Sequence, residues 1–154
     1  MCKFKSVIIL KDEIFCPDYD HHQDMLSELK IEDTKANAER LFVRAELSPL
    51  NRDMFSDIDT WEFKVDQDII PDWFVEEYEK ERTTKAVKAW AEKHIYIGEK
   101  DLKIEIKENT ALYLKDCANV TVKTCGRSTA TVKTYGSSTA TVKTCGSSTA
   151  TVKT

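Results

Sequence analysis

The sequence has few of the features that mark nucleotide-binding, zinc-binding or membrane proteins. Its four glycines lie at positions 98, 126, 136 and 146, too far apart to form a glycine-rich loop around a phosphate. Its five cysteines contain no Cys-x-x-Cys pair, and their odd number favours free thiols over a disulfide framework. No apolar run reaches the roughly 18 residues that a membrane-spanning helix needs. The sequence therefore offers no nucleotide loop, no cysteine-based zinc knuckle and no membrane span.

The N-terminus lacks the pattern of a secretory signal. The apolar stretch that ends at Leu10 is short, and Lys11, Asp12 and Glu13 follow it at once. Free thiols are typical of a reducing compartment. We therefore expect a cytoplasmic protein that does not associate with a membrane.

What the sequence does contain is a ten-residue repeat over its last third. TVKTCGRSTA at residues 121–130 is followed by TVKTYGSSTA, TVKTCGSSTA and a final TVKT. A short fixed period with Gly-Ser-Ser turns and β-branched residues between them is typical of stacked rungs in a β-solenoid. The fold class predicted is an α+β head domain over residues 1–100, followed by an all-β, short-period β-solenoid over residues 101–154.

Residues ten apart form columns that predict the two faces of each rung, because alternate residues of a strand point the same way. The predicted inward core is Leu102, Leu112, Val122, Val132, Val142, Val152, Ala130, Ala140 and Ala150. The predicted exposed ladder is Thr129, Thr131, Lys133, Thr139, Thr141 and Lys143. The turns are assigned to Gly126, Gly136 and Gly146, since glycine allows the chain to turn sharply.

The number of residues in one coil is either ten or twenty. A ten-residue coil leaves almost no interior volume, whereas a twenty-residue coil made of two repeats is easier to fill. Cys125, Tyr135 and Cys145 alternate along the repeats, so a coil of twenty stacks the two cysteines about 4.8 Å apart and places the tyrosine on the opposite side. The alternation favours twenty.

The head is expected to contain two pairs of strands. Apolar runs at residues 4–10 and 14–16 flank a charged turn, which predicts a hairpin. Residues 41–47 and 61–65 alternate apolar and polar side chains, which is typical of half-buried strands, and we expect them to pair. The residues of the last strand predicted to be buried are Trp61, Phe63 and Val65.

Two helices are expected in the head. The first spans residues 21–31, with Asp20 placed to cap it. The second runs from Pro71 to about residue 94, with acids early and bases late, as the helix dipole favours. Its apolar residues, which are predicted to cover the sheet, are Phe74, Tyr78, Val87, Trp90 and Ala91.

The stretch around the first helix is rich in potential metal ligands and acid–base groups. Cys16, His22 and Asp24 are the metal candidates, but neighbouring side chains at a helix start cannot all converge on one ion, and Asp24 is also explained as a first-turn charge. A Cys16 nucleophile with a His22 base is the catalytic alternative, without a third group to orient the base. We expect no catalytic residue and no cofactor.

Several segments of the chain carry a resemblance to other proteins. They are the opening MCKF, residues 14–18 (IFCPD), residues 41–47, residues 63–66 (FKVD) before residues 71–74 (PDWF), and the GSS-containing tail. With these segments the chain resembles a group of uncharacterised bacterial and phage proteins with a small N-terminal α+β domain and a repeat-rich C-terminus. The resemblance covers most of the chain and implies no established activity, cofactor or catalytic residue.

Charge is divided unevenly between the two parts of the chain. Residues 1–110 carry 26 acids and 17 bases, a balance of −9, whereas residues 111–154 carry one acid and six bases, a balance of +5. An acidic head and a basic tail favour association between copies or docking on an anionic partner. We therefore predict a non-enzymatic structural or interaction protein, a homo-oligomer through its solenoid or bound to another protein.

Two other functions are weighed against this one. The Thr/Lys ladder can serve as a surface-recognition module for ice or an anionic polymer, although Lys133 and its copies interrupt a flat hydroxyl array. Nucleic acid is not expected as a partner, because Tyr113 and Tyr135 are the only aromatic platforms in the tail. A small enzyme in the head domain is the remaining alternative.

Overall fold

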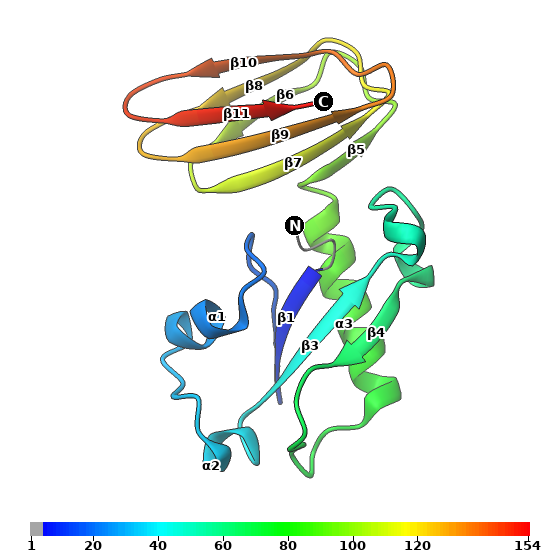
Figure 1. The fold of residues 1–154 in the computed structure, drawn as a ribbon, viewed down its shortest axis with the longest axis vertical. Helices are drawn as coiled ribbons and strands as arrows, with labels where there is room; N and C mark the ends of the chain where they lie inside the picture. The colour runs from blue at the N-terminus through cyan, green and yellow to red at the C-terminus, as the bar shows by residue number, and fades with distance from the viewer. Residues whose placement is uncertain (1–4) are drawn as a thin grey trace. The chain divides into compact units, whose positions relative to one another are not determined.

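The computed structural model describes residues 5–154 and combines strands in three sheets with a few helices (Figure 1). This mixed composition of helices and strands agrees with the sequence prediction. The chain divides into two compact units, Met1–Trp90 and Ala91–Thr154. The boundary lies ahead of the predicted one at residue 100, because strand β5 (Ile95–Ile97) pairs with a strand of the repeat segment. None of the described helices is long and apolar enough to cross a bilayer.

The first unit contains one antiparallel sheet with the strand order β2-β1-β3-β4. Its strands are β1 (Lys5–Leu10), β2 (Ile14–Phe15), β3 (Phe42–Ser48) and β4 (Glu62–Val65). The predicted hairpin is confirmed, since β1 pairs with β2 across residues 11–13. The predicted pairing of the third and fourth strands is also confirmed, with Leu47 opposite Phe63. The short 3-10 helices η1 (Leu50–Arg52) and η2 (Ile58–Thr60) lie in the connection between them.

Helices lie against both faces of this sheet. The short helices α1 (His22–Glu28) and α2 (Lys35–Ala38) contribute Met25, Leu26 and Ala38 to a core with Ile8 and Phe42. The longer helix α3 (Glu76–Ala91) passes behind β1 and β3 in Figure 1. Buried apolar residues on the sheet therefore alternate between two helix-covered faces.

Both predicted helices are shorter than the sequence pattern suggested. Asp20 does not cap α1, because its side chain accepts hydrogen bonds from Lys5 Nζ at 2.7 Å and from the Ser6 N–H at 3.1 Å. Pro71 does not open α3 either. The Phe74 N–H donates to the Pro71 carbonyl in a separate turn, and the helix begins at Glu76.

The face that α3 buries agrees with the prediction in part, because Val87, Trp90 and Ala91 are buried as expected, whereas Phe74 lies before the helix. Tyr78 is 61% exposed, while Glu79, Thr83, Val87 and Trp90 form a buried stripe at helical spacing. The stripe includes a carboxylate because Arg82 Nη1 donates to Glu79 Oε2 at 2.7 Å. The apolar pattern alone missed Glu79 and Thr83, because these two residues of the buried stripe are polar.

The fourth strand is less buried than predicted. Trp61 is 2% exposed, as expected, but Phe63 and Val65 are half-buried. The strand β4 is the last of the sheet, so its side chains have neighbours on one side only.

The second unit consists of two parallel sheets whose strands alternate along the chain. One sheet has the order β11-β9-β7-β5 and the other β10-β8-β6. The strands after β5 are β6 (Lys103–Ile106), β7 (Thr110–Lys115), β8 (Val120–Thr124), β9 (Thr129–Tyr135), β10 (Ala140–Thr144) and β11 (Thr149–Lys153). Each strand of the repeat therefore pairs with the second strand before it rather than with its predecessor.

The register of the repeat strands is twenty residues. Val142 lies opposite Val122, and Ala150 lies opposite Ala130. The earlier rungs are shorter, because Val122 lies opposite Ile104, eighteen residues before it. Leu102 is therefore not in the column of Leu112 and Val122 as predicted; it is half-buried and packs against the edge of the core.

The predicted inward core is buried near the start of the repeat and opens toward its end. Leu112, Val122, Val132 and Ala130 are at most 1% exposed. Val142, Ala140 and Ala150 are partly buried and pack against this core. Val152 is 50% exposed, which corrects its assignment to the core, because β11 has a strand on one side only.

The outward ladder is exposed at most, but not all, of the predicted positions. Thr129, Thr139, Thr141 and Lys143 are exposed, whereas Thr131 and Lys133 are half-buried. For Lys133 the difference arises from the preceding rung, where the Tyr113 ring lies 4.9 Å from Lys133 Nζ. An aromatic residue opposite a repeat position therefore covers part of the ladder.

Each turn of the repeat has a glycine with positive φ and is closed by the serine two residues after that glycine. Gly126, Gly136 and Gly146 have φ values of 73°, 62° and 68°. Ser128 Oγ donates to the carbonyl three residues before it at 2.7 Å, and the later turns repeat this bond. The glycine turn assignment is confirmed.

Replacing Gly136 with alanine is expected to destabilise the protein more than the same change at Gly126. A Cβ at Gly136 would lie 2.1 Å from Asp116 Oδ1, which accepts from the Ser137 N–H, whereas a Cβ at Gly126 meets no atom within 4 Å. Positive φ costs about 1–2 kcal/mol in both variants, and losing the Asp116 bond adds about 1 kcal/mol to the first. Denaturant unfolding of both variants measures the difference, and equal losses would contradict the Asp116 contact.

Candidate functional site

The outer edges of β10 and β11 are the most unusual surface of the second unit. Each strand pairs on one side only among the described residues, β10 with β8 and β11 with β9. The Thr149 N–H donates inward to the Ser128 carbonyl, so the N–H groups of Ala150 and Val152 point to the outer edge. Together with the exposed Val152 side chain, these groups form a surface on which another strand can pair. We call it the outer edge.

The lysines of the ladder lie in two columns that end at this edge. In one sheet Glu105 lies opposite Lys123, which in turn lies opposite Lys143. In the other sheet the column runs from Tyr113 through Lys133 to Lys153. The first lysine of each column thus has an acidic or aromatic neighbour, while the last lysine has a like charge beside it. Positive charge accumulates toward the outer edge.

The stacked turns bring two thiols together. Cys125 and Cys145 follow the paired residues Thr124 and Thr144, and the Cys145 thiol donates to Cys125 Sγ at 2.6 Å. Both side chains are partly exposed. Tyr135 occupies the equivalent repeat position at the end of β9, in the other sheet. Stacked cysteines with the tyrosine in the other sheet are the arrangement predicted for a coil of twenty residues.

In the first unit, the structure assembles a ligand-bearing cluster that the sequence did not indicate. His22, at the start of α1, lies with Glu46 of β3 and Asp66, one residue beyond β4, and their ligand atoms are all within 4.8 Å of one another. His22 Nε2 donates to the Ala45 carbonyl at 3.2 Å, and Nδ1 faces Asp66 Oδ2 at 3.6 Å. Two carboxylates and one imidazole nitrogen are suitable ligands for a divalent cation.

Of the three predicted metal candidates, only His22 belongs to this cluster. Asp24 instead contacts His21, with Nδ1 and Oδ2 3.2 Å apart on the surface. Cys16 lies in different surroundings, where burial raises the pKa of its thiol to about 11 and Lys5 opposes the shift. A thiol with so high a pKa is a poor nucleophile, and the recorded partners of His22 are the Ala45 carbonyl and Asp66 rather than Cys16. Glu46 and Asp66 were missed because the sheet, not the sequence, makes them neighbours.

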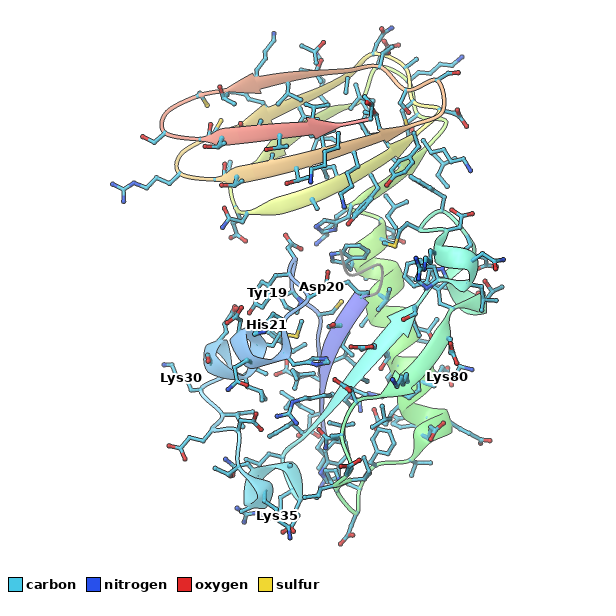
Figure 2. All side chains as sticks on the ribbon, in the orientation of Figure 1. Tyr19, Asp20, His21, Lys30, Lys35 and Lys80 are labelled. Carbon is cyan, nitrogen blue, oxygen red and sulfur yellow. The ribbon has the colours of Figure 1, made fainter. Side chains whose placement is uncertain are left out.

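A buried lysine explains why Asp20 is not a helix cap. Lys5 is fully buried, and its Nζ donates to Asp20 Oδ1 at 2.7 Å and to the Tyr19 carbonyl at 3.1 Å. The ammonium also lies 5.1 Å from the centre of the Trp90 ring. Figure 2 shows Tyr19 and Asp20 in the segment that leads into α1. Asp20 therefore fixes this segment to β1 by neutralising a buried charge.

Comparisons with known proteins add no relative to this picture, since no family model, no curated protein and no solved structure matches the chain. The resemblance to bacterial and phage proteins with a repeat-rich C-terminus stays a prediction.

Replacing Asp20 with asparagine is expected to lower the free energy of unfolding by about 3 kcal/mol, because it leaves the buried Lys5 ammonium without a counter-charge. Asp24→Asn is the matched control, since the contact of Asp24 with His21 is exposed and contributes less than about 1 kcal/mol. Urea unfolding monitored by tryptophan fluorescence compares the two variants. Equal stability of the two would contradict the role assigned to Asp20.

Replacing Asp66 with asparagine is expected to lower the pKa of Glu46. Burial raises this pKa above its usual value, and the Asp66 carboxylate raises it further, while His22 and Lys64 oppose the shift. Removing the Asp66 charge takes away one of the two main causes, so the carboxyl should ionise at lower pH. Carbon-detected NMR titration of Glu46 measures the change. An unchanged pKa would show that the two carboxylates are not neighbours in solution.

Proposed function

We propose that residues 91–154 form a β-solenoid with twenty residues in each repeat coil. Two features support this proposal. Successive strands alternate between two parallel sheets, and the repeat strands keep an unbroken register of twenty residues. In such a coil, the apolar columns fill the interior and the Thr/Lys ladder lies outside.

We further propose that this protein is a non-enzymatic interaction module that associates with a second copy of itself through the outer edge. The supporting observation is the one-sided pairing of β10 and β11, whose outward N–H and C=O groups have no strand beside them in the described part of the chain. Unpaired edges of this kind add strands readily. The partly exposed Val142, Ala150 and Val152 provide apolar area that a further rung would cover.

A second copy fits this edge because the repeat strands are nearly identical. The strand TATVK of β11 stacks on the same sequence in β9, so the interface between rungs is already one between like strands. Two copies related by a two-fold axis would meet edge to edge with antiparallel strands. A register centred on Thr151 then places Ala150 opposite Val152 of the second copy, and both of these residues direct their N–H groups outward.

The proposed assembly is a closed dimer rather than a fibre. The opposite end of the stack is made of β5 and β6, whose sequences IYI and KIEI differ from the repeat. A head-to-tail stack would therefore pair unlike strands. The two-fold arrangement instead pairs the outer edge of one copy with the outer edge of the other, so no outer edge is left to add a third copy.

Salt distinguishes this dimer from association between the acidic and basic parts of the chain. Edge-to-edge contact brings Lys143 and Lys153 of one copy toward those of the other, so salt screens a repulsion and does not weaken the dimer. Attraction between an acidic head and a basic tail would weaken as salt rises.

An anionic polymer is the second candidate partner, and one observation favours it. The lysine columns Lys123–Lys143 and Lys133–Lys153 leave like charges side by side, which a polyanion would neutralise. Binding of this kind would occur on the ladder faces and would persist in a variant whose outer edge is blocked.

Replacing Val152 with proline is expected to weaken the dimer at least about tenfold. Proline removes an outward N–H from each copy but leaves the inward bond of the Thr149 N–H to the Ser128 carbonyl in place. Val152→Ala is the matched control, since it removes the side chain and keeps the N–H. Sedimentation equilibrium at 50 and 500 mM salt measures the dissociation constant of the dimer for each variant.

Two results would overturn the proposed function. A strictly monomeric chain at every concentration would exclude self-association. Loss of the dimer in both variants alike would show that the backbone edge is not the contact, and a dimer that dissociates as salt rises would favour the charge-driven arrangement instead.

A further inference from the structure

The two thiols at the stacked turns are close enough to react with each other. Cys125 Sγ and Cys145 Sγ are 2.6 Å apart, and no other described cysteine is recorded beside them. A disulfide requires Cα atoms about 4.4–6.8 Å apart, and neighbouring strands lie about 4.7–4.9 Å apart. Because Cys125 and Cys145 directly follow the register pair Thr124 and Thr144, the backbone already provides this spacing.

The turns hold both cysteines in place in the reduced protein. Ser128 Oγ donates to the Cys125 carbonyl at 2.7 Å, and Ser148 Oγ donates to the Cys145 carbonyl at 2.8 Å. The Cys125 N–H donates to the Ile106 carbonyl, and the Cys145 N–H donates to the Thr124 carbonyl, so each turn is also fixed to the preceding rung. Forming a bond between the sulfurs therefore requires little movement of the chain.

We propose that Cys125 and Cys145 form a disulfide between neighbouring rungs under oxidising conditions, and that this bond strengthens the outer edge through which the proposed dimer forms. The formation of the disulfide is inferred from the geometry of the thiols alone. Its effect on the outer edge rests on the proposed function. The oxidant assigned is a low-molecular-weight disulfide, such as glutathione disulfide.

The reaction is a thiol–disulfide exchange in two steps. One protein thiolate attacks a sulfur of the small disulfide, forming a mixed disulfide and releasing one small thiolate. The other protein thiolate then attacks the protein sulfur of the mixed disulfide and releases the second small thiolate. One sulfur–sulfur bond breaks and one forms; the two protons lost by the cysteines end on the two small thiols, and the two electrons reduce the oxidant.

The bond would act where the unit is least tightly packed. The strand β10, which precedes Cys145, is bounded by β8 on one side only, and its Val142 is half-buried. Rungs at the end of a stack open more readily than those within it, because they bury less apolar area. A covalent link from Cys145 to Cys125 would tie β10, the outermost strand of its sheet, to the buried part of the stack. The outer edge would then stay ordered for docking.

Cross-linking should be slow at neutral pH and faster at higher pH. The hydrogen-bonded contact with the Cys145 thiol raises the pKa of Cys125, burial and Glu105 raise it further, and Lys123 lowers it. The thiolate is the attacking form, so the rate should rise between pH 7 and pH 9 as more of it is present.

The experiment uses the full chain, incubated with glutathione disulfide or with a phosphine reductant. Trypsin cleavage after Lys123, Arg127, Lys143 and Lys153 releases the two cysteines in peptides 124–127 and 144–153. We expect these peptides to be joined by a disulfide in the oxidised sample and separate in the reduced one. In parallel, sedimentation equilibrium should give a dissociation constant of the dimer at least about threefold lower for the oxidised protein.

Two variants serve as controls. Cys125→Ser should lose both the linked peptides and the effect of oxidation on the dimer. Cys16→Ala removes a cysteine outside the repeat and should keep both. Circular dichroism confirms that each variant has the spectrum of the unchanged protein.

The outcomes separate the inference from the proposed function. Free Cys125 and Cys145 after oxidation, or peptides joined to another cysteine, would overturn the disulfide. A Cys125–Cys145 disulfide with the same dissociation constant of the dimer in the oxidised and reduced protein would overturn the effect on the outer edge. A correct disulfide in a chain that is monomeric in both states would overturn the proposed dimer and with it the effect on the edge, while the cross-link itself would stand.

Discussion

The structure of the second unit depends on the parallel pairing of strands that are twenty residues apart. Backbone hydrogen bonds between β8 and β10, and between β9 and β11, hold nearly identical sequences in register. Because side chains alternate along a strand, this register stacks valine on valine inside and lysine on lysine outside. A shift by one residue would exchange the two faces and expose the whole apolar column. The core, the thiol pair and the lysine columns all follow from this one constraint.

The same constraint creates the outer edge, the surface through which we propose that the dimer forms. A stack of like strands presents at its edge the same backbone groups that join its rungs, and side chains there have neighbours on one side only. Val152 is half exposed for this reason, although its partner Val132, on the neighbouring strand β9 of the same sheet, is fully buried. Repetition thus stabilises the inner rungs and leaves the last ones open to a partner.

The first unit contains two buried charged side chains, Lys5 and Glu79, and each has a partner of opposite charge. Lys5 lies beneath the segment that carries Asp20, and Glu79 lies in the buried stripe of α3 beside Arg82. Charged groups in such positions need their partners, since an isolated buried charge is strongly destabilising. These pairs set the positions of the loop before α1 and of α3, rather than adding chemistry to a site.

The sequence predicts regular parts of the fold better than irregular ones. The inner part of the repeat core, the glycine turns and the paired strands of the head follow from local patterns of apolar residues and glycines, which is why they were predicted correctly. Leu102 was assigned to the wrong column because the register between β6 and β8 is eighteen residues, two fewer than between the repeat strands. No local sequence pattern indicates that difference. The buried face of α3 and the role of Asp20 depend on Glu79 and Lys5, polar residues whose burial only tertiary contacts explain. The His22–Glu46–Asp66 cluster joins three distant segments, so sequence proximity pointed to Asp24 and Cys16 instead.

The register itself is tested most directly by paired spin labels. Labels at Thr131 and Thr151 should show strong spin–spin coupling by electron paramagnetic resonance, because these residues are partners on β9 and β11. Labels at Thr131 and Thr141 should couple weakly, since β10 belongs to the other sheet. Stronger coupling in the second pair would indicate a coil of ten residues and would contradict the arrangement on which this account depends.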